Sequence, residues 1–219
     1  MKKIRLAIGC IVIVALLPIV VHAQVTDIEG NTYKTIQIGT QLWMAENLKT
    51  TKYNNGIGIP LVTGSEWDTM TTQGYCWYSN NFKSFGKTYG ALYNWYAVES
   101  GNLCPTGWHV PSDDDWTALS EYLGGENAAG GRLKESGTRH WKSPNAGATN
   151  SNGFTALPGG GRWVVGRFDL IGRRGYWWSS SAYDNNSDPS IRMILFDESF
   201  FKRAPGIKGN GFSVRCIKD

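Results

Sequence analysis

The segment 103–116 constrains the fold most, because it joins a cysteine-bearing lead-in to a clearly marked helix start. Ser112 can cap the exposed backbone amides, and Asp115 follows three residues later to form a variant capping box. The carboxylates at 113–115 lie at the positive end of the helix dipole. Apolar side chains then recur at helical spacing until Gly124-Gly125; they are Trp116, Leu119, Tyr122 and Leu123. The pattern predicts a helix over 112–123.

Residues 1–23 have the pattern of a secretory signal peptide: a basic head, an apolar run over 6–21 and small residues before the cleavage point. The run is too short for a membrane span, and it continues well past Cys10, which argues against a lipid anchor there. We therefore expect cleavage after Ala23 and an exported domain of residues 24–219 without a transmembrane segment. Its location would be the periplasm, the outer surface or the medium.

The composition predicts one loop-rich domain with an aromatic core. The formal net charge of +4 includes three basic residues of the leader, so the mature chain is close to neutral. This balance gives no support for a nucleic-acid partner or an anionic membrane. The chain has 10 Trp, 10 Tyr, 8 Phe and 27 Gly, and its length suits a single domain with a full core.

Three cysteines remain after removal of the leader, and an oxidising compartment favours one disulfide among them. The spacing alone does not settle the pairing. Cys216 shares one face of an expected closing strand, 211–217, with Phe212 and Val214, so it should face the core. We expect a Cys104–Cys216 disulfide, worth roughly 4–5 kcal/mol through closure of a long loop, with Cys76 free or intermolecular. No cysteines have zinc-ligand spacing.

The remaining patterns predict short elements joined by long loops. A hairpin is expected from 32–38 and 41–44, and a helix over 88–98 despite Gly90. Further candidates are a short helix over about 127–136 and strands at 75–78, 154–157, 162–165, 175–180, 191–196 and 211–217. The predicted fold class is α+β: a single loop-rich domain with two to three short helices and short antiparallel strands.

Seven motifs follow one another along the chain: DIEGN at 27–31, QLWMAENL at 41–48, YGALYNW at 89–95, CPTGWHVP at 104–111, GFTALPGG at 153–160, YWWSSS at 176–181 and GFSVRC at 211–216. In kind and order they resemble the Fibrobacter succinogenes major paralogous domain family, over nearly all of residues 25–219. The resemblance implies an exported or surface protein of Fibrobacter- and Bacteroidota-type bacteria. It implies no established activity.

A second likeness concerns the fold. Early helices, a loop-rich second half, a Trp-rich strand and a final Cys-bearing strand resemble the C-type-lectin-like fold. Formylglycine-generating sulfatase modifiers share that fold and have helix starts similar to Pro111-Ser112-Asp113 with Trp116. Their oxidation chemistry uses a nearby pair of cysteines that holds copper, and no such pair is evident here. Fold alone does not give function.

Three candidate sites also have structural explanations. The acids at 113–115 could hold a metal, but a capped helix start explains all three. His109 has no recognisable catalytic partner and should face outward or meet a backbone group. Residues 184–188 begin like an EF-hand loop, but Pro189 and Leu195 stand where glycine and a bidentate glutamate are required. We expect a polar turn and no cofactor, with a different kind of calcium loop left open.

The long loops of the second half, 138–152, 183–190 and 197–210, are the expected recognition surface. Flat rings can stack on a sugar or peptide, and amides and carboxylates can bind hydroxyls, although most rings in such a chain must form the core. The candidate ligand-binding residues are Trp141, Asn145, Trp163, Asp184, Asn185, Asn186, Asp188 and Arg192. The preferred hypothesis is a non-catalytic recognition or adhesion domain that binds a glycan or a surface protein. The alternatives are a structural envelope component and an enzyme related to the formylglycine-generating oxidases.

Overall fold

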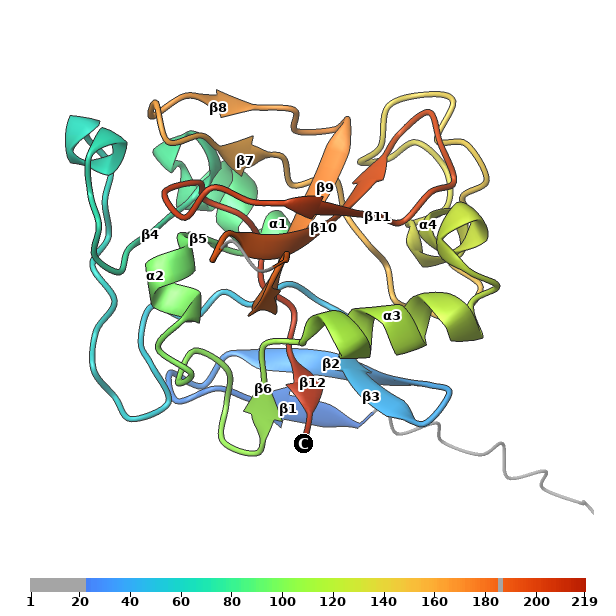
Figure 1. Ribbon diagram of the computed structural model, residues 1–219, viewed down its shortest axis with the longest axis horizontal. Helices are drawn as coiled ribbons and strands as arrows, with labels where there is room; N and C mark the ends of the chain where they lie inside the picture. The colour runs from blue at the N-terminus through green and yellow to red at the C-terminus, as the bar shows by residue number, and fades with distance from the viewer. Residues whose placement is uncertain (1–22, 185–186) are drawn as a thin grey trace, which may run out of the picture.

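The main sheet brings together strands from both ends of the chain (Figure 1). The computed structural model describes residues 23–184 and 187–219; the rest of the predicted signal peptide and Asn185-Asn186 lie outside that part. The antiparallel strands follow the order β1-β2-β3-β12-β6; their bounds are Gln24–Thr26, Thr32–Ile38, Gln41–Met44, Ile217–Lys218 and Trp108–His109. The predicted hairpin is confirmed: Gly39, at φ +58, turns β2 into β3, and Ile36 pairs with Trp43.

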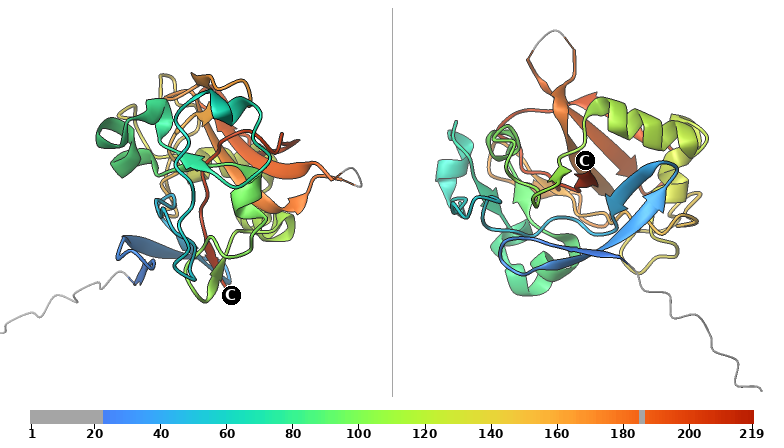
Figure 2. Two further views of the ribbon diagram at one scale, coloured as in Figure 1. Left: turned by 90° about the vertical axis from the view of Figure 1, so that its left-hand side faces the viewer. Right: turned by 90° about the horizontal axis from the view of Figure 1, so that it is seen from below.

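A second antiparallel sheet has the order β11-β10-β9, with β9 at Arg174–Ala182, β10 at Pro189–Leu195 and β11 at Lys202–Pro205. β9 and β10 confirm the strands predicted at 175–180 and 191–196. β11 lies within 197–210, where we expected only a loop. Seen from below, the β9–β10 hairpin projects outward beside the N-terminal end of α3 (Figure 2).

Two short ladders complete the strands: β4 (Tyr75–Cys76) with β5 (Leu92–Tyr93), and β7 (Gly161–Arg162) with β8 (Phe168–Asp169). The strand predicted at 154–157 is wrong, because only Ala156 forms a bridge, to Lys134. The closing strand is shorter than the predicted 211–217. Residues 211–213 make isolated bridges to three different segments before β12 begins.

The helix predicted over 112–123 is confirmed as α3 (Asp113–Tyr122). Ser112 Oγ accepts the Asp115 amide at 3.1 Å, and Asp115 Oδ2 accepts the Ser112 amide at 2.8 Å, so the capping box is complete. Trp116, Leu119 and Leu123 are buried. Tyr122 was expected in the same stripe but is 66% exposed, because its position in the helical turn places it at the edge of that face.

The single helix predicted over 88–98 is wrong. The chain forms α1 (Lys87–Tyr89) and α2 (Trp95–Val98), with the extended β5 between them. Gly90 explains the break: its φ is +79, and a Cβ there would lie 2.6 Å from the Leu48 carbonyl oxygen. Tertiary contact therefore overrides the helical periodicity.

The other helical segments are short. α4 (Glu126–Leu133) ends earlier than predicted, because Lys134 turns into extended backbone. Two 3₁₀ turns, η1 (Ser65–Asp68) and η2 (Tyr78–Asn80), precede a π-helical turn, η3 (Phe82–Gly86). The chain is thus a small single-domain α+β protein with few short helices and antiparallel sheets, as predicted.

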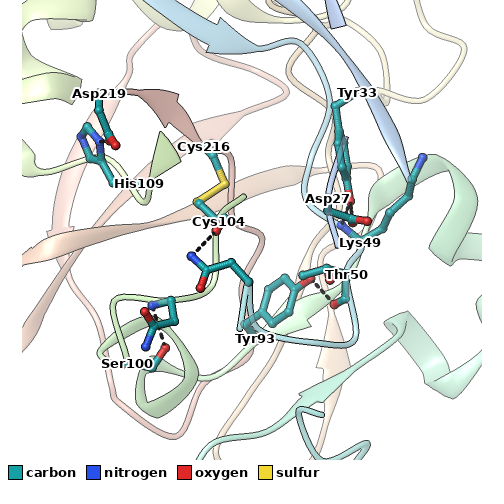
Figure 3. Close-up of a disulfide and its surroundings, with 12 residues drawn as sticks. Asp27, Tyr33, Lys49, Thr50, Tyr93, Ser100, Cys104, His109, Cys216 and Asp219 are labelled. Carbon is teal, nitrogen blue, oxygen red and sulfur yellow. Dashed lines mark hydrogen bonds and ion pairs between the residues drawn. A yellow bond between two sulfur atoms is a disulfide. The ribbon is translucent and has the colours of Figure 1, made fainter. Parts of the chain in front are cut away.

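The predicted disulfide, Cys104–Cys216, is present and joins the segment before β6 to the segment before β12 (Figure 3). Its Cα atoms are 6.0 Å apart, and both cysteines are buried in the largest apolar cluster. Asn54 Nδ2 donates to the Cys104 carbonyl at 3.0 Å and ties a distant loop to the bridge. Cys76 is free and fully buried in a smaller cluster with Trp67.

Candidate functional site

Trp141 is not part of a ligand surface, contrary to our expectation. Only 1% of it is exposed, and its Nε1 donates to the Ala156 carbonyl at 2.9 Å. The ammonium of Lys134 lies 5.4 Å from the centre of its ring. A ring enclosed in this way has no face left for a ligand, because the loop that carries it packs onto the segments beside α4.

Asn145 was also expected to face a ligand, but it is buried, with only 5% of its surface exposed. Its Nδ2 donates to the carbonyls of Glu135 and Gly137 at 2.8 and 2.6 Å. These bonds fasten the loop 138–152 to the end of α4. The side chain therefore holds the loop in shape and is not available for hydroxyls.

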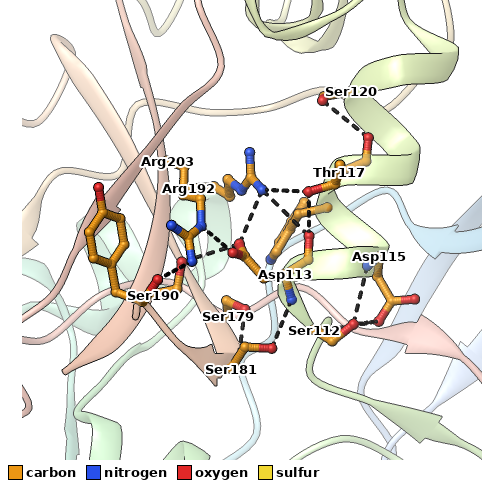
Figure 4. Close-up of polar contacts among 12 residues, drawn as sticks. Ser112, Asp113, Asp115, Thr117, Ser120, Ser179, Ser181, Ser190, Arg192 and Arg203 are labelled. Carbon is orange, nitrogen blue, oxygen red and sulfur yellow. Dashed lines mark hydrogen bonds and ion pairs between the residues drawn. The ribbon is translucent and has the colours of Figure 1, made fainter. Parts of the chain in front are cut away.

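Arg192 is the third expected ligand residue that the structure buries, with 1% exposed. From the middle strand β10 it reaches the start of α3, where Nη2 contacts Asp113 Oδ1 at 3.1 Å and Thr117 Oγ1 at 3.0 Å (Figure 4). Its Nη1 contacts Glu126 at 2.8 Å. Partners on two helices bind both Nη atoms, while the buried Nε has no partner among the described residues, so the role of Arg192 is to join the helices to the sheet.

Asp113 is the centre of this cluster (Figure 4). Its second carboxylate oxygen accepts from Arg203 Nε, and the Arg203 guanidinium also stacks on the Tyr183 ring at 4.3 Å. Ser181 Oγ accepts the Asp113 amide at 3.0 Å. An acid that the sequence explains as part of a helix cap therefore also fixes the base of the β9–β10 hairpin.

His109 has two carboxylate partners that the sequence did not reveal. Its Nδ1 is 2.6 Å from Asp219 Oδ1, and its Nε2 is 3.2 Å from Asp115 Oδ2 (Figure 3 shows the first contact). The Ser112 hydroxyl is bonded to Asp115 at 2.6 Å, not to the imidazole. The geometry links the last residue to the start of α3 and lacks the hydroxyl–imidazole contact of a nucleophilic site.

The other predicted residues that the structure describes, Trp163, Asp184 and Asp188, lie at the surface. Trp163 is partly exposed and packs edge-on against Tyr176 and Phe212 at 5.7 and 5.6 Å. Asp184 and Asp188 are exposed. Within residues 23–184 and 187–219, no three His, Cys, Asp or Glu side chains converge to hold a metal ion. Asn185 and Asn186 lie outside this part of the chain.

Asp188 lines a groove of about 640 Å³, which we call the loop groove. Two of the three predicted loops meet there, since residues 205–209 form one of its walls. The remaining walls come from segments that we did not expect in a site: residues 68–71, which begin with the last residue of η1, Tyr96 on α2 and Val164. The structure therefore brings Asp188 together with new residues, and among the predicted residues that it describes, the others do not line this groove.

Close packing holds the walls of the loop groove. The Trp95 amide donates to the Lys208 carbonyl at 3.0 Å and ties 205–209 to the start of α2. A Cβ at Gly206 would lie 2.6 Å from the Trp178 ring, so this loop rests directly on the core. At the wall formed by residues 68–71, Gly166 packs against Asp68, and a Cβ at Gly166 would lie only 2.5 Å from Asp68 Oδ1.

The polar side chains of the loop groove are available to a ligand. Asp68, Tyr96 and Lys208 make no side-chain hydrogen bond or ion pair with any other residue that the structure describes. Together with Asp188 they offer two carboxylates, a phenol and an ammonium group, beside the apolar Met70, Val164 and Ile207. This chemistry suits a ligand with several hydroxyl or amide groups.

The segments that carry the sequence motifs form much of the buried core. Asn47 Oδ1 accepts from Trp177 Nε1 at 2.9 Å and from Arg215 Nη2 at 2.9 Å. Arg215 is fully buried, and its Nη1 donates to the Phe154 carbonyl. Trp178 Nε1 donates to the Tyr93 carbonyl at 2.7 Å. Motif segments far apart in the sequence thus bond to one another in the core.

A family model, the Fibrobacter succinogenes major domain, matches residues 36–218, which include this network and the whole of the second sheet. The chain belongs to this family. The family motifs supply the buried scaffold, whereas Asp68, Tyr96 and Lys208 come from segments outside them. No curated protein and no solved structure shows a significant match to the chain. None of the helices formed by the described residues has the length and apolar character needed to cross a bilayer.

Proposed function

We propose that this domain is an exported, non-catalytic recognition or adhesion module of the bacterial envelope, and that it binds a glycan in the loop groove. The observation that carries the proposal is the set of polar side chains in that groove without partners among the described residues. By contrast, Asp113 and Arg192, which carry charged groups of the same kind, are used to hold the structure together. Groups left open in a concave site are suited to binding another molecule.

A glycan fits this groove for two reasons. Asp68 and Asp188 can accept hydrogen bonds from vicinal hydroxyls, while Lys208 donates. Tyr96 adds a ring and a hydroxyl at the same position, which suits a molecule with both C–H and O–H surfaces. A single open groove buries little of a sugar, so binding at one site should be weak and clustering would raise avidity. A surface protein is the alternative ligand.

The enzyme alternative has less support. Formylglycine-type oxidation needs two reactive cysteines side by side, but Cys104 and Cys216 are joined in a disulfide. Burial raises the pKa of the Cys76 thiol to about 12, despite the nearby Arg162, so this thiol is neutral. A purely structural role in the envelope is the remaining alternative, and it predicts no ligand for either Asp68 or Tyr96.

Two finer statements belong to the same proposal. The first is that the fold is C-type-lectin-like. Three features support it: both ends of the chain contribute strands to one sheet, a disulfide holds the closing segment, and the second half is rich in loops. The second is that the domain is exported after removal of residues 1–23; the basic head and apolar run of that segment support export.

A glycan array probed with the mature domain tests the function directly. Asp68→Asn with Tyr96→Phe removes a charge and a hydroxyl while keeping both shapes. We expect at least about tenfold weaker binding to the best array ligand, since each lost hydrogen bond is worth about 1 kcal/mol. Glu121→Gln, an exposed carboxylate on α3, is the matched control and should bind as the parent does. An array without ligands, or a double variant with unchanged affinity, would contradict the proposal.

A further inference from the structure

A second groove, of about 510 Å³, lies in the first half of the chain; we call it the aromatic groove. One wall consists of rings, and the other carries a carboxylate, an amide, an ammonium group and a hydroxyl. The rings are Tyr75, Trp77 and Phe82, and the polar residues are Glu29, Asn31, Lys49 and Thr51. None of these residues was expected in a site, and none lines the loop groove.

The ring wall is held in a fixed position. Phe82 is 45% exposed, and its ring centre lies 4.7 Å from that of Trp77, which in turn meets Tyr75 edge-on at 5.5 Å. Phe82 begins the π-helical turn η3, which ends at Gly86. A Cβ at Gly86 would lie 2.3 Å from the Phe82 ring and 2.8 Å from the Trp77 ring. Because the Gly86 backbone is ordinary right-handed helix, it is the fit of the two rings that requires a glycine there.

The polar wall is also built before any ligand arrives. Glu29 accepts the Thr51 amide at 2.5 Å, the Thr51 hydroxyl at 2.7 Å and the Thr50 hydroxyl at 3.0 Å. Burial raises the pKa of Glu29, but these bonds and the charge of Lys52 outweigh burial and bring the pKa below its ordinary value. The carboxylate is therefore ionised and fixed. Three of its roughly four lone-pair sites are occupied, which leaves the second site of Oε1 for a hydroxyl.

Lys49 completes this wall. Its ammonium lies 5.0 Å from the centre of the Tyr33 ring and 4.0 Å from Glu46, at the outer limit of an ion pair. Neither contact uses all three of its N–H donors. The opposite charges of Lys49 and Glu29 leave the groove without a net preference for an acidic or a basic ligand.

We propose that the aromatic groove is a second saccharide site, which seats one hexopyranose ring with its C–H face on Phe82 and its hydroxyls toward Glu29 and Lys49. A pyranose has one apolar face and a rim of hydroxyls, so it matches a groove with one ring wall and one polar wall. A lipid chain or an apolar peptide would cover Glu29 and Lys49 without replacing their water.

This inference goes beyond the proposed function, because it uses no residue of the loop groove. Two saccharide sites on one domain would let a single copy contact two sugar units or two strands. The second contact would then be intramolecular and would raise avidity without a change in either site. The two sites can fail independently of each other.

The test is a titration of the ¹⁵N-labelled mature domain with three probes: methyl β-D-glucopyranoside, methyl β-D-galactopyranoside and methyl α-D-mannopyranoside. One stacked ring and a few hydrogen bonds should give millimolar dissociation constants, so each titration runs to about 50 mM. The Trp77 indole N–H and the amides of 82–86 should shift with at least one probe. Phe82→Ala should abolish the shifts, and Gly86→Ala should weaken binding at least threefold by displacing the ring.

Phe200→Ala is the matched control, since Phe200 is 41% exposed and does not line this groove. It should bind as the parent does. Absence of shifts at Trp77 and 82–86 with all three probes overturns the inference, as does unchanged binding by a folded Phe82→Ala variant. Shifts confined to 68–71 and 205–209 would also overturn it, while leaving the loop groove supported.

Discussion

Replacement of Trp116 by alanine should destabilise the domain strongly, because this side chain joins α3 to both sheets. Its ring is fully buried and lies 4.6 Å from Trp43 of β3, 5.6 Å from Phe201 and 6.4 Å from Phe154. Its Nε1 donates to the carbonyl of Trp178 in β9 at 3.4 Å. Rigid rings cannot collapse into the space left behind, so most of the cavity would persist.

The expected loss is about 4 kcal/mol, in the middle of the range for removal of large buried side chains. Guanidinium unfolding followed by far-UV circular dichroism, with the disulfide intact, measures it without relying on tryptophan emission. The midpoint should fall by about 1 M guanidinium chloride. Tyr122→Ala on the same helix is the control, because Tyr122 is 66% exposed and its loss should change stability by less than about 0.5 kcal/mol. Equal shifts for the two variants would refute the packing assigned to α3.

Three further outcomes are expected. Ser112→Ala should cost about 1 kcal/mol in the same unfolding assay, because it removes one half of the capping box. The native protein should show no thiol that reacts with Ellman's reagent, because Cys76 is buried and burial raises its pKa to about 12. The denatured mature protein should show one reactive thiol. Peptide mapping that joins Cys76 to another cysteine would contradict this. Burial raises the pKa of Asp115, but hydrogen bonds with Ser112 and His109 outweigh burial and lower this pKa overall. The ionised Asp115 therefore stabilises the fold fully above about pH 4, and this contribution is lost as the pH falls further. Asp115→Asn should therefore flatten the acid limb of the stability profile.

The helix over 112–123 could be predicted because its signals are local. A cap, a capping box, first-turn acids and a terminal glycine pair act within a few residues of one another. The helix over 88–98 could not, because the approach of Gly90 to Leu48 depends on a segment some forty residues away. Local signals were enough for the helix over 112–123. They failed over 88–98, where contact with the backbone of Leu48 determines the conformation.

The disulfide was predicted from the core-facing position of Cys216 and from the closure of a long loop, and neither argument by itself selects Cys104 over Cys76 as the partner. Loop length would not have selected it, since Cys76 is further from Cys216 along the chain than Cys104 is. The deciding fact is the pairing of β12 with β6, which brings the segments before both strands together. Cys76 lies instead under Arg162 in a separate cluster.

The candidate site was only partly predictable. Asp188 of the predicted loop 183–190 and residues 205–209 of the predicted loop 197–210 do meet at a groove, but Trp141 and Arg192 are buried by neighbours that no local pattern reveals. The aromatic groove was missed, although one signal was present. Phe82 is a large ring among Asn80, Asn81, Lys83 and Ser84, where a core position is not expected. An aromatic side chain isolated in a polar segment is a reason to consider a binding surface.

Glycan binding in the loop groove is tested most directly by a chemical-shift map of the ¹⁵N-labelled mature domain with the best ligand from the glycan array. We expect the largest shifts on residues 68–71, Tyr96 and 205–209, the walls of the loop groove, and Asp68→Asn with Tyr96→Phe should reduce them at equal ligand concentration. Shifts of the same size at residues 138–152 or along α3, with the loop groove unchanged, would contradict it.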